Sequence, residues 1–324
     1  MPTRYILCWL FLVGLAVDLA AAEPKSSSPT EAPAAADSAP AEPQGPTPLN
    51  KSGTVMIDSA GHRLILKSQV VLRAGLLEML LCKAQTKEHE SILAIDADAY
   101  VIHAGLLALG AEVGSPVRFD PEFQPPQGTK IKIQLRWKDE EGKQHTEKAQ
   151  NWIRHAVYRF YSSPLSQLPQ GFQLPKESEL RYDEQNGELI WYGPMTSAQR
   201  DDLMSLSQDA QYRKGIEHFY QQSQFRPLEA DWVFAGSGFW VQADGKRIYQ
   251  AEEGNVICVA NFGDAMLDIA VASTASNDGL QFEPWTEHIP PIGTDVEVDL
   301  IPVLEANAAT DSESETPQEK PERP

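Results

Sequence analysis

Alternating apolar and polar residues dominate the middle of the chain and predict short β-strands. In the clearest run, Ile131, Ile133, Leu135 and Trp137 alternate with polar residues. A period of two places every second side chain on the same face of a strand, so one face of this strand should be buried. Shorter apolar runs also predict strands, and they lie at residues 55–57, 64–66, 70–72, 76–81, 91–95, 232–234, 239–241, 247–249, 256–259, 267–272 and 296–300.

Two turn signals join such runs into antiparallel hairpins. The polar residues 139–142 end in a glycine and return the chain toward Trp152 and Ile153. A second hairpin is expected at residues 183–191, around Asn186-Gly187, because Asn-Gly is the strongest short signal for a hairpin turn.

Two segments have the spacing of helices instead of strands. Residues 99–109 carry apolar residues at helical intervals, with Asp98 placed to cap the start and Gly110 to stop the end. Residues 164–226 are more polar and are interpreted as an insertion on the outside of the body. The predicted fold class is α+β: a β-rich domain of antiparallel hairpins, with a short helix near 99–109 and a helical insertion near 196–224.

The first residues have the pattern of an export signal. Arg4 precedes an apolar run at residues 5–17, and the small residues that end at Ala22 form a cleavage site. The run is shorter than the about 20 apolar residues that a membrane-spanning helix needs. We therefore expect residues 1–22 to be a signal peptide cleaved after Ala22, with no membrane span afterwards. The protein would then be exported, periplasmic or extracellular, and an uncleaved membrane anchor is the less favoured alternative.

Composition separates two further segments from the fold. Residues 23–50 are rich in Pro and Ala and are expected to form a disordered linker, and residues 304–324 form a disordered acidic tail. The folded domain is thus expected at residues 51–303. It carries a formal charge of −12 out of the −19 of the whole chain. This acidic balance argues against nucleic acid or an anionic membrane surface as the main partner, because like charges repel.

One segment combines residues that could carry chemistry. Cys82 ends an apolar run, His89 precedes the next one, and His103 lies in the following helical segment. A nearby imidazole could activate the thiol as a nucleophile. Alternatively, these three residues could bind zinc or another divalent metal together with Glu88 or Glu90. The structural alternative is that Cys82 is a small buried apolar residue and that the loop after it is held by charge pairs.

The remaining cysteines and the tryptophans allow two further hypotheses. Cys8 would leave with the signal, so Cys82 and Cys258 could form a disulfide in an oxidising compartment. Six tryptophans could line a sugar-binding face, although core positions are the favoured interpretation in a β-rich protein. They are Trp137, Trp152, Trp191, Trp232, Trp240 and Trp285.

Residues 77–82, 86–92 and 103–110 together resemble the YdjY-type domain of exported bacterial proteins, and the Cys-x4-Lys-x-His-Glu-Ser block is the specific part. Residues 231–237 and 254–257 look like the second half of that domain. The resemblance implies an exported domain spanning about residues 54–303. It also implies a candidate ligand or metal site, without a known role, at Cys82, Lys87, His89, Glu90, Ser91 and His103.

Some members of that family have been labelled ferredoxin-like. We expect no iron–sulfur cluster here, because a conventional cluster generally takes four protein ligands and only Cys82 and Cys258 remain after cleavage. No resident cofactor is predicted, and a divalent metal is left open.

Two functions follow from these observations. The first is an exported, non-catalytic binding or structural domain, whose partner is an unknown ligand or a component of the cell envelope. The alternative is a thiol- or metal-dependent site at Cys82, His89 and His103, in an extracytoplasmic enzyme or metal-binding protein.

Overall fold

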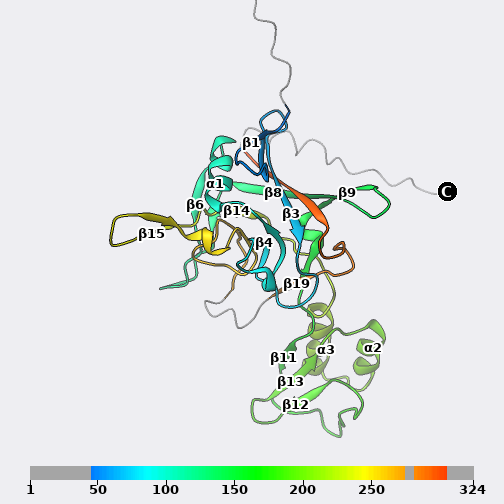
Figure 1. Cartoon of the computed structure of the whole chain (residues 1–324). Helices are drawn as coiled ribbons and strands as arrows, with labels where there is room; N and C mark the ends of the chain where they lie inside the picture. The colour runs from blue at the N-terminus through cyan, green and yellow to red at the C-terminus, as the bar shows by residue number, and fades with distance from the viewer. Residues whose placement is uncertain (1–44, 274–280, 305–324) are drawn as a thin grey trace, which may run out of the picture. The chain divides into compact units, whose positions relative to one another are not determined.

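The computed structural model describes residues 45–273 and 281–304 (Figure 1). The predicted signal peptide, its cleavage site and nearly all of the predicted acidic tail lie outside these residues. Most of the predicted linker also lies outside them. Among the described residues, no helix combines the length and the apolar character that crossing a membrane requires.

Eight strands close into a barrel. Each strand pairs with the next in the order given below, and β5 pairs back with β3 to close the ring. The strands are β3 (Arg63–Val70), β20 (Asp295–Pro302), β8 (Lys130–Lys138), β14 (Trp232–Phe234), β18 (Leu267–Ile269), β17 (Ile257–Cys258), β4 (Met79–Lys83) and β5 (Ser91–Ile95). Closure leaves no unpaired sheet edge around the ring.

The β-rich α+β class is confirmed, but antiparallel hairpins describe only part of the barrel. Strand β4 runs parallel to β5, and β17 runs parallel to β18. Strand β20 lies between β3 and β8 although it comes near the end of the chain. The barrel therefore depends on pairings between distant segments, which turn signals do not reveal.

Alternating side chains fill the interior of the barrel. On β8, Ile131, Ile133 and Leu135 are buried in the main core, while the residues between them face outward. Burying such a side chain stabilises the fold by about 1.5–3 kcal/mol. Four of the six tryptophans in question are buried, as the core interpretation predicts, and they are Trp137, Trp152, Trp191 and Trp232.

Three further strands extend the barrel sheet beyond the ring. Strand β2 (Val55–Asp58) pairs with β3, and β1 (Thr47–Pro48) pairs with β2. The sheet therefore starts inside the segment that composition assigned to the linker. On the other side, β9 (Gln144–Lys148) pairs with β8.

The first predicted hairpin has a different return strand from the one expected. The chain returns directly in β9, a polar strand without a buried face, which gives no apolar pattern to recognise. Trp152 ends the short 3₁₀ helix η2 (Ala149–Trp152), and β10 (Ile153–His155) pairs with β19 (Phe282–Pro284) instead.

Helix α1 (Ala99–Ala108) corresponds to the helix predicted near 99–109 and packs on the barrel. A Cβ atom at Gly105 would lie 2.5 Å from Leu64 Cδ1, so glycine permits this close approach. Asp98 occupies the N-cap position but makes no side-chain cap, since its carboxylate pairs with Lys83 at 2.8 Å. Two small sheets lie nearby: β6 (Val113–Ser115) with β7 (Gln127–Gly128), and β15 (Phe239–Val241) with β16 (Arg247–Tyr249).

The insertion has its own sheet, helices and core. Its strands are β11 (Phe160–Pro164), β12 (Arg181–Asp183) and β13 (Glu188–Tyr192), and its helices are α2 (Ser197–Ser205) and α3 (Ala210–Gln222). Thr196 and Gln199 form a capping box at the start of α2, and the Asp209 side chain caps α3. The segment predicted to be helical near 196–224 thus contains two helices, and the three-stranded sheet packed with them starts at Phe160.

Candidate functional site

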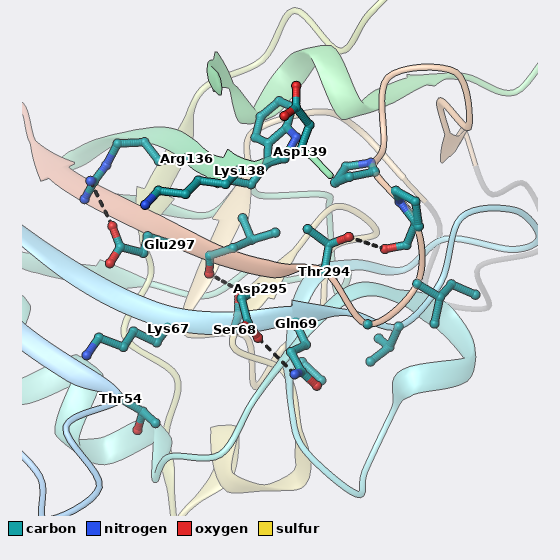
Figure 2. Close-up of a pocket in the computed structure, with 18 of the residues that line it drawn as sticks. Thr54, Lys67, Ser68, Gln69, Arg136, Lys138, Asp139, Thr294, Asp295 and Glu297 are labelled. Carbon is teal, nitrogen blue, oxygen red and sulfur yellow. Dashed lines mark hydrogen bonds and ion pairs between the residues drawn. The ribbon is translucent and has the colours of Figure 1, made fainter. Parts of the chain in front are cut away.

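A groove of about 1380 Å³ lies on the outer face of the barrel (Figure 2). It crosses four neighbouring strands, β5, β3, β20 and β8. The loop at residues 290–294 and the turn at residues 139–141 form parts of its rim. The charged residues that line it are Lys67, Glu88, Asp96, Arg136, Lys138, Asp139, Glu140, Glu141, Asp295 and Glu297.

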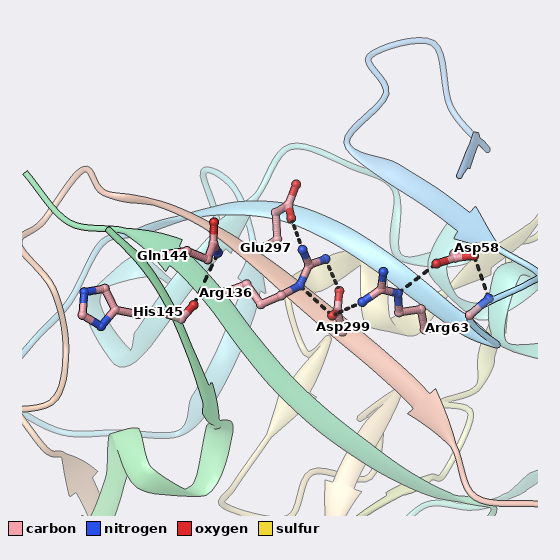
Figure 3. Close-up of polar contacts among 8 residues, drawn as sticks. Asp58, Arg63, Arg136, Gln144, His145, Glu297 and Asp299 are labelled. Carbon is pink, nitrogen blue, oxygen red and sulfur yellow. Dashed lines mark hydrogen bonds and ion pairs between the residues drawn. The ribbon is translucent and has the colours of Figure 1, made fainter. Parts of the chain in front are cut away.

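A network of ion pairs fixes one side of the groove floor (Figure 3). The Asp299 carboxylate, at 0% exposure, accepts hydrogen bonds from Arg136 Nε and Nη2, both at 2.7 Å. It also accepts a hydrogen bond from Arg63 Nη1 at 2.8 Å. The hydrogen bonds from Arg136 to Asp299 and the negative charge of Asp299 raise the pKa of Arg136.

The network continues to both sides of Asp299. Arg136 Nη1 pairs with Glu297 Oε2 at 2.8 Å, and Arg63 Nε donates to Asp58 Oδ2 at 3.0 Å. The Gly61 backbone N–H and Arg63 lower the pKa of Asp58. Since two carboxylates already hold Arg136, its guanidinium is part of the floor and not a free ligand group.

Other charged side chains in the groove remain available to a ligand. Lys67 on β3 and Lys138 on β8 are exposed, and neither has an ion-pair partner within residues 45–273 and 281–304. Asp96, Glu140 and Glu141 are exposed as well and likewise lack a side-chain partner in that part of the chain. The groove therefore combines a fixed floor with free charges of both signs.

The turn after β8 is held in a defined shape. Asp139 accepts hydrogen bonds from the Lys143 backbone N–H at 2.8 Å and shares a hydrogen bond with His145 Nε2 at 2.7 Å. The His145 ring stacks on Trp137 with 5.1 Å between ring centroids. His145 is the main reason why the pKa of Asp139 is lowered. Glu140 and Glu141 thus lie in a turn whose shape is fixed by the hydrogen bonds of Asp139.

Cys82 is not placed as an accessible nucleophile. Its side chain is 0% exposed and packs in a small apolar cluster with Met79, Ala94, Cys258 and Ala265. Burial raises the pKa of the thiol and outweighs the opposing hydrogen bond with Ser91. The protonated thiol is therefore favoured, although thiolate is the reactive form.

The loop after Cys82 includes the 3₁₀ helix η1 (Glu88–Glu90) and is held by charge contacts. Glu90 pairs with Lys87 at 3.4 Å and with His89 at 3.6 Å, and the His89 side chain is 76% exposed. Lys87 Nζ lies 4.9 Å from the centroid of the Phe262 ring. Ser91 donates to the Leu93 carbonyl at 2.8 Å. These contacts match the structural alternative given for this loop.

His103 belongs to a different environment. Its Nδ1 lies 2.9 Å from the Tyr249 hydroxyl, which donates to the Gly236 carbonyl at 3.0 Å. Its ring packs edge-on against Phe234, and burial lowers its pKa. Across the described ranges, no three His, Cys, Asp or Glu side chains are grouped as a metal site would require. Cys82, His89 and His103 thus do not share a site there.

The possible disulfide between Cys82 and Cys258 is not formed, because both are free, buried thiols. Their strands are neighbours, but the register pairs Cys258 with Met79. Cys82 lies three residues after Met79 on β4. Since a strand advances about 3.3 Å per residue, Cys82 is roughly 10 Å from the position that pairs with Cys258. A disulfide needs Cα atoms closer than about 7 Å.

The groove was not predicted from the sequence. Its sequence signal lies in two alternating runs: the outward positions of residues 130–138 are mostly basic, and those of residues 295–299 are acidic. Opposite charges on two strands favour their pairing across a sheet.

The barrel and its charged outer groove define a β-rich α+β domain with a candidate binding surface. Residues 54–157 match the model of the YdjY domain family. The matched residues supply β3, β4, β5 and β8, whereas β14, β17, β18 and β20 complete the barrel from outside the match. No curated protein and no solved structure matches the chain.

Proposed function

We propose that this protein is a non-catalytic binding domain and that the groove across β5, β3, β20 and β8 is its ligand site. The observation that carries the proposal is the groove itself, about 1380 Å³ in volume, with a floor fixed by the Asp299 network and free charged groups above it. Fixed surroundings lower the cost of ordering a site when a ligand binds.

The size and lining of the groove favour an extended polar ligand. Pockets for small molecules usually enclose about 300–1,000 Å³. This groove is larger, and ten charged side chains line it. A segment of a peptide or glycan chain fits these properties better than a compact apolar molecule.

The alternative function, a thiol- or metal-dependent site, has less support. It needs Cys82, His89 and His103 to act together, whereas Cys82 is buried and His89 is largely exposed. The hydrogen bond of His103 to Tyr249 already gives that ring a structural role.

We also propose that the protein is exported to the periplasm or the outside of the cell. The sequence pattern of residues 1–22 supports export, and the acidic charge of residues 51–303 disfavours nucleic acid. A component of the cell envelope is then a suitable source of the ligand.

Binding measurements with a blocked groove test the ligand site. Gln69 is exposed on β3 and lines the groove, so Gln69→Trp should fill it, whereas Gln185→Trp places the same residue in the exposed β12–β13 turn. The full chain would be titrated with hexalysine, hexaglutamate, hexaserine and soluble glycan fragments of bacterial cell wall.

We expect at least one of these probes to bind the unmodified chain and the Gln185→Trp variant, and to lose at least tenfold in affinity with Gln69→Trp. Thermal unfolding would verify that both variants fold. The proposal fails if no probe binds, or if Gln69→Trp binds as well as the unmodified chain.

A further inference from the structure

We infer that the ligand of this groove is a cationic, extended chain, such as a lysine- or arginine-rich peptide segment. This inference rests on the proposed function and adds the chemical class of the ligand. Three observations carry it: the charge of the lining, the placement of the free carboxylates and the length of the groove.

The lining of the groove is strongly acidic. Seven carboxylate side chains line it against three cationic side chains, which gives a formal charge of −4. Arg136 pairs with Glu297 of the same lining, and leaving out both residues gives six carboxylates against two cations, which is the same charge of −4. The groove therefore attracts cations and repels anions, and its concave shape strengthens this effect.

The free carboxylates lie toward two ends of the groove. Asp96 directly follows β5, at one side of the four strands, and Glu140 and Glu141 lie in the turn after β8, at the other. Lys67 and Lys138 lie on strands between these two groups. A cationic chain that crosses the strands can thus meet carboxylates at both ends.

The distance across the strands sets the length of such a chain. Neighbouring strands are about 4.8 Å apart, so the four strands from β5 to β8 span roughly 14 Å, and the β8–β9 turn extends the groove further. An extended peptide advances about 3.3 Å per residue. Five or six residues are therefore enough to reach from Asp96 to the turn that carries Glu140 and Glu141.

Titrations of the full chain with hexalysine, hexaserine and hexaglutamate test the charge of the ligand. We expect hexalysine to bind most tightly and hexaglutamate not to bind. Raising the salt from 0.05 to 0.5 M should weaken hexalysine binding about tenfold or more, because it screens exposed charges.

A matched pair of double variants separates the groove from the overall charge of the protein. Glu140→Gln with Glu141→Gln should weaken hexalysine binding about tenfold. Glu177→Gln with Glu179→Gln changes the net charge equally at exposed positions outside the groove, and should leave the affinity unchanged. Lys138→Gln should act in the opposite direction and tighten hexalysine binding severalfold, since it removes a free cation from the lining.

The outcomes distinguish this inference from the proposed function. If hexaglutamate, hexaserine or a glycan fragment binds better than hexalysine and Gln69→Trp blocks it, the groove is a ligand site and the inference is wrong. If hexalysine is weakened equally by both double variants, its binding is general attraction to an acidic protein, which also overturns the inference. If no probe binds, both statements fail.

Discussion

Asp268 is a carboxyl group that the fold removes completely from water. Its side chain is 0% exposed on β18, and its two oxygens accept hydrogen bonds from the backbone N–H groups of Ile269 at 2.9 Å and Phe262 at 3.2 Å. Burial raises its pKa from 3.8 to about 7, against the opposing effect of these backbone donors. Burial also raises the pKa of the neighbouring Cys258 thiol, and the charge of Asp268 adds to that shift.

The raised pKa of Asp268 predicts that the protein loses stability as pH rises from about 4 to about 7. In this range the folded protein keeps the proton while the unfolded chain releases it, so the contribution is complete below pH 4 and is lost by about pH 7. The shift corresponds to roughly 4 kcal/mol in the free energy of unfolding. Asp268→Asn, which cannot titrate, should flatten this dependence in urea denaturation measured at several pH values.

The control for this prediction is Asp231→Asn, because the Asp231 side chain is 55% exposed. It should retain the pH dependence of the unmodified protein. A pH dependence that survives Asp268→Asn would show that other groups cause it.

The environments of Cys82 and His103 could be predicted only in part from the sequence. The pattern around Cys82 correctly identified the end of a strand, and burial then decided the role of the thiol. Whether His103 lies near Cys82 depends on which strands are neighbours around the barrel. His103 instead meets Tyr249, which is 146 residues away in sequence. No local pattern contains that information.

Strand β20 shows how an element combines core packing with charge pairing. Its inward residues Val296, Val298 and Leu300 belong to the main core, and three outward residues are acidic: Asp295, Glu297 and Asp299. Its register places Asp299 opposite Ile65 on β3 and Gln134 on β8, within reach of Arg63 and Arg136.

Removing the charge of Asp299 should destabilise this part of the barrel. Asp299→Asn would leave two arginines beside a neutral group, and breaking a buried ion pair costs about 3–5 kcal/mol. The arginine side chains are 30% and 23% exposed, so water compensates part of this loss and we expect about 2–4 kcal/mol. Urea denaturation would measure the change in the free energy of unfolding.

Glu297→Gln is the comparison within the same strand. Glu297 pairs with the same Arg136, but its side chain is 42% exposed, so its loss should cost less than about 1 kcal/mol. Equal effects of the two variants would mean that Asp299 does not hold the arginines.

The sequence predicted the positions of strands and helices better than it predicted which strands pair with each other. The alternation at residues 131–137 correctly predicted β8, and the helical spacing correctly predicted α1. The polar strand β9 was missed because neither of its faces is buried. The parallel pairing of β4 with β5 was missed because only residues 84–90 connect these strands, and parallel strands usually need a longer connection.

Residues 45–273 and 281–304 together contain two large apolar cores. The main core fills the barrel, and a second core in the insertion gathers residues from β11, β13 and both helices. The chain enters and leaves the insertion through paired segments, since His155 N–H donates to the Arg226 carbonyl at 3.0 Å and Leu228 N–H to the Ile153 carbonyl at 2.9 Å. A second core that two chain segments connect to the barrel favours separate unfolding.

Alanine substitutions in the two cores should therefore accelerate hydrogen exchange in different parts of the chain. Ile216 on α3 is 0% exposed in the second core, and Ile216→Ala should cost about 2–5 kcal/mol locally. We expect hydrogen exchange, followed by mass spectrometry, to accelerate in residues 160–222 and not in β3 or β8.

Ile133→Ala is the matched change in the main core, where Ile133 is 2% exposed on β8. It should accelerate exchange in the barrel strands, because their amides open only when the main core opens. If Ile216→Ala accelerated exchange in β3 and β8 as much as in α3, the two cores would unfold as one cooperative unit. The groove would then depend on the insertion for its stability, whereas separate unfolding would leave the groove intact while the insertion opens.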